Sequence, residues 1–119
     1  MINKSRLIDT FCDLVRIDSP SGHEREIALF LQKWLIYLGL SVTIDDYGNV
    51  IGSNGGESPL LISAHMDTVE PGRNVKPIVD GDWIVSDGTT ILGGDCKAAV
   101  ASVLEAITSI KDAGNAIIP

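Results

Sequence analysis

The spacing of apolar residues changes along the chain from a helical period to a strand period, and this change limits the folds that the chain can adopt. In residues 4–16, and again in the segment that ends before Gly39, apolar side chains recur every three or four positions, which is typical of helices that bury one face. These positions are Leu7, Phe11, Leu14, Val15, Ile27, Phe30, Leu31, Trp34, Leu35 and Leu38. After Gly39, apolar and polar residues alternate, as in strands with one buried face. The order predicts an α/β chain.

Start and stop signals surround the second helical pattern. Residues 21–24 (Ser-Gly-His-Glu) fit a capping box, in which the Ser21 side chain accepts from a free backbone N–H and Glu24 reaches back. Gly39 is typical of a helix end. A helix is therefore predicted between them, with His23 as a solvated residue of its first turn rather than a metal ligand.

Further elements follow the second predicted helix. Val42 and Ile44 alternate with polar residues, and residues 47–49 predict a turn into a partner strand that begins at residue 50. A third helix is predicted over residues 96–112, and its buried positions would be Val100, Val103, Leu104, Ile107 and Ile110.

Residues 60–64 form a continuous apolar run, which is typical of a strand buried on both faces of a layered sheet. Residues 116–119 resemble the beginning of a further strand. Because ligands bind at the carboxyl ends of strands in such sheets, His65 and Asp67, which follow the apolar run, are candidate site residues.

Composition excludes several classes of partner. The chain has 119 residues, with 9 Lys and Arg against 16 Asp and Glu, and a formal net charge of -7. The basic residues are scattered, so we expect neither nucleic acid nor a membrane as a partner. No apolar run approaches the ~18 residues that cross a bilayer, and the first six residues do not resemble a signal peptide. Two cysteines, Cys12 and Cys96, are too few for a disulfide scaffold, so we expect a cytoplasmic protein.

His65 and Asp67 are separated by two positions, so on an extended backbone their side chains point the same way. A metal-bound imidazole and the carboxylate that orients it require this arrangement. A polar strand terminus without a metal is an equally good interpretation of this pair on its own.

A second cluster lies at residues 93–97 (Gly-Gly-Asp-Cys-Lys). Asp95 occupies a position where a carboxylate can cap a helix, which is one interpretation of it. Lys97 falls in the first helical turn, where the macrodipole disfavours a cation, so a nearby carboxylate or anionic ligand would explain it. Cys96 has no second cysteine at zinc-site spacing and is interpreted as a small residue beside the site.

Together, residues 60–68 (LLISAHMDT) and 91–99 (ILGGDCKAA) resemble the H-x-D-T and G-x-D-x-K elements of the di-zinc exopeptidases and amidohydrolases that include peptidase T, carboxypeptidase G and the aminoacylases. The D-x-K form and residues 17–22, 46–50 and 88–90 are similar to the peptidase T branch. The resemblance implies a three-layer αβα fold with a mixed, mostly parallel sheet.

The resemblance also implies roles and a cofactor. His65 would bind one zinc ion, Asp95 would bridge two zinc ions, and Asp67 would be the catalytic-site carboxylate that holds His65. Two such ions lower the pKa of a shared water and polarise the scissile carbonyl. A cis peptide bond is expected after Asp95, and Cys96 stands where the family often has a second Asp.

The family takes its general base and another metal ligand from an adjacent Glu pair, and further ligands from a later Asp or Glu and a distant His. The five glutamates here are never adjacent. We therefore expect residues 1–119 to be the amino-terminal half of a zinc-peptidase catalytic domain, without its lid or dimerisation domain and inactive alone. The whole enzyme would remove amino-terminal residues from short peptides.

Two alternatives remain open. The first is a deacylase of N-acyl amino acids, because it hydrolyses an amide with the same metal centre. The second is a non-catalytic domain that associates with itself through an unpaired sheet edge.

Overall fold

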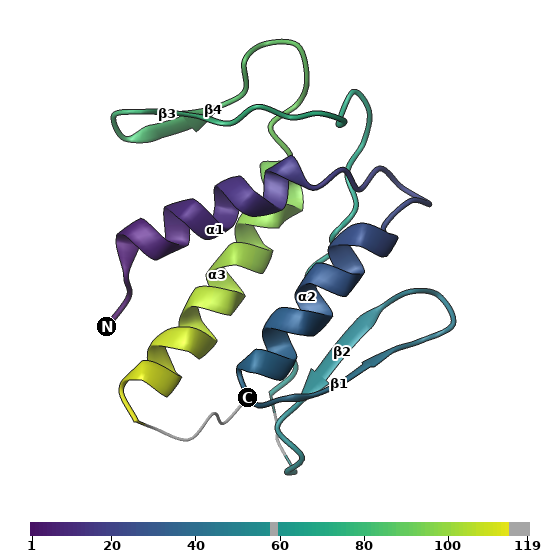
Figure 1. The fold of residues 1–119 in the computed structure, drawn as a ribbon, viewed down its shortest axis with the longest axis vertical. Coiled ribbons are helices and arrows are strands. Elements are labelled where there is room, and N and C mark those ends of the chain that lie inside the picture. The colour runs from purple at the N-terminus through teal and green to yellow at the C-terminus, as the bar shows by residue number, and fades with distance from the viewer. Residues whose placement is uncertain (58–59, 115–119) are drawn as a thin grey trace.

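In a computed structural model that describes residues 1–57 and 60–114, two helices are followed by two short hairpins and a third helix (Figure 1). The described elements are α1 (Lys4–Arg16), α2 (Arg25–Tyr37), β1 (Ser41–Ile44), β2 (Val50–Ser53), β3 (Ile78–Asp80), β4 (Trp83–Val85) and α3 (Gly94–Asp112). None of the described helices is long and apolar enough to cross a bilayer. Helix α2 packs against the β1–β2 hairpin, and this packing of a helix on a sheet confirms the predicted α/β class.

The hydrophobic core lies between the three helices. Helix α1 packs against α3, and α2 packs against β1 and β2 (Figure 1). The core combines the apolar stripes of all three helices with one loop residue, and its buried members are Phe11, Leu14, Val15, Ile27, Leu31, Val75, Val100, Ala101 and Leu104. The predicted stripes of α1 and α2 are confirmed. In α3, Val103 and Ile107 are only half-buried and Ile110 is exposed, because this helix turns a different face inward.

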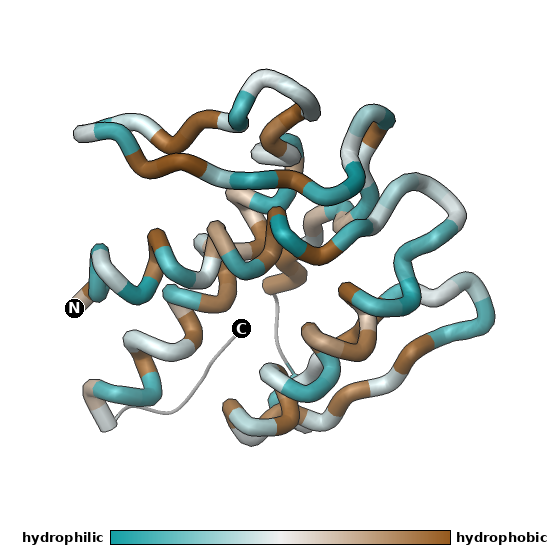
Figure 2. Tube along the Cα trace, turned by 45° about the horizontal axis from the view of Figure 1, so that its top comes forward, coloured by the Kyte–Doolittle hydropathy of each residue, from teal (hydrophilic) through white to brown (hydrophobic). Residues whose placement is uncertain are grey.

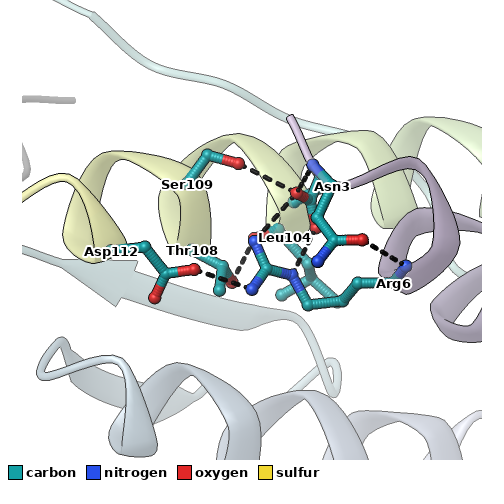
Figure 3. A network of polar contacts seen from close by, with 7 residues as sticks. Asn3, Arg6, Leu104, Thr108, Ser109 and Asp112 are labelled. Atoms are coloured by element: carbon teal, nitrogen blue, oxygen red, sulfur yellow. Dashed lines mark hydrogen bonds and ion pairs between the residues drawn. The ribbon is translucent and has the colours of Figure 1, made fainter. Parts of the chain in front are cut away.

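A network of ion pairs joins the beginning of α1 to the second half of α3 (Figure 3). The Arg6 guanidinium donates to both carboxylate oxygens of Glu105, at 2.8 and 2.9 Å, and to Asp112 at 2.7 Å. Glu105 also accepts from the Asn3 backbone N–H and the Ser109 hydroxyl. Its buried carboxylate is thus fully hydrogen-bonded, which is how a charge is tolerated in the interior.

Each of the two described sheets is an antiparallel hairpin. In the first, Asp45 accepts from the backbone N–H groups of Tyr47 and Asn49, and Gly48 adopts a φ of 91°, as the predicted turn requires. In the second, Gly81 and Asp82 connect β3 to β4. The second hairpin is rich in exposed apolar side chains, and brown segments mark both of its strands in Figure 2.

The connection between α1 and α2 pairs with the chain that follows the apolar run. Pro20 and Thr68 form a parallel bridge. The Thr68 N–H donates to the Ser19 carbonyl at 2.9 Å, and the Ser21 N–H donates to the Thr68 carbonyl at 3.1 Å. Ser19, fully buried, donates its hydroxyl hydrogen to the Met66 carbonyl. These contacts place the connection directly beside His65 and Asp67.

Two local predictions differ from the structure. Residues 60–64 are not a strand, and Leu61 is 87% exposed. A strand buried on both faces needs strands beside it and layers above and below, whereas each described hairpin pairs only within itself. Among the described residues, parallel pairing is found at the single bridge between Pro20 and Thr68. The strand predicted at residues 116–119 lies outside the described residues.

The predicted capping box is wrong. Helix α2 begins at Arg25, its N-cap is Glu24, and no side chain caps it. Glu24 accepts instead from the Gly22 N–H. The Ser21 hydroxyl does not cap because it donates to Asp67.

Candidate metal centre

The His65 imidazole lies between two carboxylates that come from different parts of the chain. Its Nδ1 is 3.0 Å from Asp67 Oδ1, and its Nε2 is 3.0 Å from Asp95 Oδ1. Asp67 belongs to the same extended segment, whereas Asp95 is 30 positions away at the beginning of α3. The fold therefore brings the three predicted site residues together.

Asp67 is held from both sides. One oxygen faces His65, and the other accepts from the hydroxyl of Ser21. This hydroxyl lowers the pKa of the Asp67 carboxyl, and the contact with His65 lowers it further. The carboxylates of Asp95 and Asp67 in turn raise the pKa of His65. Because Asp67 accepts at Nδ1, it favours the imidazole tautomer whose Nε2 can bind a metal ion.

Asp95 does not cap α3, contrary to one interpretation of the sequence. The helix begins at Gly94, but Asp95 and Cys96 have non-helical backbone angles, and the N-cap Gly93 makes no side-chain cap bond. The Asp95 side chain is 97% exposed and points to His65 Nε2. Its carboxylate is thus directed to the site. The cis peptide bond expected between Asp95 and Cys96 is present.

Lys97 is almost fully buried, and this explains how a cation is accommodated in the first turn of α3. Its Nζ donates to the Ile17 carbonyl at 2.7 Å. Burial lowers the pKa of Lys97 to about 8, an effect that nearby Asp18 opposes. A backbone carbonyl, rather than the expected carboxylate or anion, is therefore its direct partner, and the contact joins α3 to the end of α1.

The thiol of Cys96 lies near the same point. Ligand atoms of His65, Asp95 and Cys96 all lie within 4.8 Å of one another. His23, by contrast, is exposed as predicted, but it lies in the connection before α2 rather than in the first helical turn. Among the described residues, the three ligand atoms form a group that could hold a metal ion.

A small hollow of about 120 Å³ opens beside Asp67. It is lined by Glu24, Met66, Asp67 and residues 47–49 at the tip of the first hairpin. The tip of that hairpin thus lies close to the candidate centre.

Sequence reasoning missed the contact of Ser21 with Asp67 and the contact of Lys97 with Ile17. The spacing of Ser21 and Glu24 predicts a capping box, and this prediction assigns the Ser21 side chain to the helix end instead. Neither contact has a local signal, since its partners lie 46 and 80 positions apart.

The chain is similar to known proteins in sequence and in fold. A tripeptidase structure from Staphylococcus aureus is 42% identical over 96% of this chain and 34% of that one, with a TM-score of 0.84. The aminopeptidase PepT structure from Bacillus cereus is 39% identical over 95% of this chain and 34% of that one, with a TM-score of 0.87. The cytosol non-specific dipeptidase of Escherichia coli is 32% identical over 82% of this chain and 23% of its own length.

No family model matches the sequence. The chain spans about a third of the length of the first relatives and structures that it matches. High structural similarity over nearly the whole chain confirms the predicted fold class. The tripeptidase, the aminopeptidase and the dipeptidase are M20 family peptidases, and the chain corresponds to part of their catalytic domain.

Proposed function

We propose that this chain is part of a zinc-dependent peptidase that removes amino-terminal residues from short peptides. The observation that carries the proposal is the position of His65, whose Nε2 lies 3.0 Å from the Asp95 carboxylate while its Nδ1 is held by Asp67. The peptidase activities named for the two solved structures support it.

The donor atoms suit zinc. Imidazole nitrogen, carboxylate oxygen and thiolate sulfur are its usual protein ligands, and the group of His65, Asp95 and Cys96 offers one of each. In the proposal His65 and Asp95 would hold the zinc ions. Bound zinc would lower the pKa of a water molecule and polarise the scissile carbonyl.

The remaining residues of the site have positioning roles in this proposal. Asp67 accepts a hydrogen bond from Nδ1–H of His65, and this bond orients the ring so that Nε2 faces Asp95. Ser21 fixes Asp67 through the second carboxylate oxygen. Lys97 holds the beginning of α3, which carries Asp95, against the end of α1.

Catalysis also needs a general base and more metal ligands than His65 and Asp95. We propose that residues 1–119 are the amino-terminal half of the catalytic domain and that an adjacent Glu pair elsewhere in the enzyme supplies them. The threefold greater length of the matched relatives supports this division. The chain alone is then inactive. A cytoplasmic location completes the proposal, supported by the name of the Escherichia coli relative.

The test compares the 119-residue chain with the protein translated from the whole reading frame of its gene. With zinc, the longer protein should cleave tripeptides and the chain alone should not. Asp95→Asn in the longer protein should lower kcat/KM by more than about 100-fold, because even residues that only orient metal ligands account for 10–100-fold. Asp82→Asn, in the exposed β3–β4 turn, is the matched control.

Strong peptidase activity of the 119-residue chain would contradict the division of the site. Faster hydrolysis of N-acyl amino acids than of tripeptides would favour the deacylase. A reading frame that ends at residue 119, with no peptidase activity, would favour the non-catalytic association domain, for which the exposure of Leu61 and Ile62 is the supporting observation.

A further inference from the structure

The loop that follows β2 contains an asparagine directly before two glycines. Residues 54–56 (Asn-Gly-Gly) are exposed. Gly55 adopts a φ of 80°, a left-handed conformation that favours glycine. Apart from its chain neighbours, no described atom lies within 4 Å of the place that a Cβ would take at Gly55. The backbone nitrogen of Gly55 is therefore shielded neither by a side chain of its own nor by a neighbouring element.

Two hydrogen bonds shape this turn. The Gly56 N–H donates to Asn54 Oδ1 at 3.1 Å, and the Gly55 N–H donates to Ser53 Oγ at 3.1 Å. The ring that the first bond closes contains both Cγ of Asn54 and the Gly55 nitrogen, so it keeps the side-chain amide turned toward that nitrogen. The same bond draws electron density from the amide carbonyl, as donors at an oxyanion do.

We propose that Asn54 is a site of spontaneous deamidation, with water as the co-reactant. The inference goes beyond the proposed peptidase function and does not depend on it. The Gly55 nitrogen attacks Cγ of Asn54 and gives its proton to solvent by way of the Ser53 hydroxyl. The new C–N bond closes a succinimide ring, the bond from Cγ to Nδ2 breaks, and Nδ2 leaves as ammonia after it takes a proton from solvent.

Water then opens the succinimide at either of its carbonyl groups. Attack at Cγ restores the original backbone and leaves an aspartate at position 54. Attack at the backbone carbonyl leaves an isoaspartate, in which the chain continues through the former side chain. Both products add a negative charge to a chain whose formal net charge is already -7. The isoaspartate also lengthens the connection between β2 and the segment that leads to His65.

The other asparagines of the described residues lack this combination of features. Asn49 and Asn74 precede valines, whose branched side chains crowd the nitrogen that would attack. Asn3 is the N-cap of α1, and its side chain accepts from the Arg6 N–H. These asparagines serve as internal comparisons for Asn54.

The experiment is a timed incubation of the purified 119-residue chain in mildly alkaline buffer. Peptide mapping by mass spectrometry locates deamidation, and protein isoaspartyl methyltransferase measures isoaspartate. The peptide with Asn54 should gain the mass of deamidation, with isoaspartate as the larger product, while the peptides with Asn49 and Asn74 stay unchanged. Because the turn is exposed, Asn54 should react at least as fast in the folded chain as in urea.

Variants of the turn separate its contributions. Gly55→Ala should slow the reaction by about tenfold or more, because a side chain disfavours the left-handed turn and crowds the attacking nitrogen. Ser53→Ala should slow it by about threefold, since one neutral hydrogen bond is lost. Gly114→Ala, at a glycine with a similar φ of 76° that does not follow an asparagine, is the matched control and should leave the rate unchanged.

Three results would overturn the inference. An Asn54 peptide that keeps its mass in the folded chain would exclude the modification. Reaction in urea alone would show that the folded turn protects the amide. An equal rate in the Gly55 variant and the wild type would show that the Gly55 nitrogen is not the attacking group.

Discussion

At the scale of single residues, the candidate centre depends on hydrogen bonds that converge on one carboxylate. Asp67 contacts His65 through one oxygen and Ser21 through the other. Ser21 also pairs with Thr68 through its backbone N–H. A serine outside the metal-ligand group therefore helps to set the direction of the imidazole.

Replacing Ser21 with Ala should weaken zinc or cobalt binding by roughly tenfold, because residues that support metal ligands account for about 10–100-fold of affinity. Isothermal titration of the purified chain measures the change. Ser5→Ala, an exposed substitution on α1, should leave affinity unchanged. Equal affinities for the Ser21 variant and the wild type would show that Asp67 needs no second partner.

Gly72 is required for a different reason, which is a close backbone approach. A Cβ atom at this position would lie 2.5 Å from the Val69 carbonyl oxygen and 2.7 Å from Thr68 Oγ1. Gly72→Ala should therefore lower the free energy of unfolding by about 1–3 kcal/mol, measured by urea denaturation. Gly56→Ala, whose Cβ would meet only the Asn54 side chain at 3.7 Å, should stay within about 0.5 kcal/mol of wild type.

At the scale of elements, residues of α3 contact α1 near both ends of α1. Lys97 contacts the end of α1 through the Ile17 carbonyl, and Glu105 contacts its beginning through Arg6. The Arg6 guanidinium lowers the pKa of Glu105 to about 2, from an ordinary value of 4.5. Because Asp95 is carried by α3, these contacts also determine where that carboxylate lies relative to His65.

The Glu105 contact predicts a pH dependence of stability. A depressed pKa in the folded chain means that this stabilisation is complete above about pH 5 and is lost as the pH falls toward 2. Glu105→Gln should cost about 2 kcal/mol at pH 7, where hydrogen bonds to a charged group are lost, and much less near pH 2. Urea unfolding of both proteins across this range measures the difference.

Asp112→Asn is the control for this experiment. Asp112 contacts the same guanidinium, but its side chain is 60% exposed, so its loss should cost less than about 1 kcal/mol. If wild type and the Glu105 variant differed in free energy of unfolding by the same amount at pH 7 and near pH 2, the pH dependence would not come from the Glu105 carboxylate.

The elements differ in how far the sequence predicts them. The bounds of α1 and the first hairpin follow from local period and turn signals, and the structure has both close to the expected residues. The beginning of α2 does not follow from local signals, because the Ser21 hydroxyl donates to Asp67, which lies 46 positions away in the chain. The pairing of His65 with Asp67 was predictable from their spacing, whereas the approach of Asp95 was implied only by the family resemblance. The burial of Lys97 depends on how α1 and α3 pack.

At the scale of the whole molecule, the chain is flat. Its principal extents are 44 × 36 × 21 Å, and its radius of gyration is 14.6 Å. A globular chain of this length has a radius of gyration of about 13.5 Å. Large apolar side chains are exposed to solvent, among them Leu61, Ile62 and Trp83. A flat chain with exposed apolar residues favours association.

Self-association is therefore expected at micromolar concentrations, and Leu61 and Ile62 should take part because their side chains are exposed. Leu61→Lys should raise the dissociation constant by about tenfold or more, from the lost burial of one leucine side chain. Sedimentation velocity over a concentration series measures it. Ile36→Lys, exposed on α2, is the control. A monomer at every concentration would refute the expectation.

The contact between the Ser19 hydroxyl and the Met66 carbonyl spans 47 positions of the chain, and it has a thermodynamic consequence for the metal centre. Closing a loop of this length costs entropy before the donor atoms can meet, so the unfolded chain offers an ion little affinity. By mass action, an ion that binds only the folded chain raises the free energy of unfolding. The melting temperature of the chain should thus rise with metal concentration and report site occupancy without any substrate.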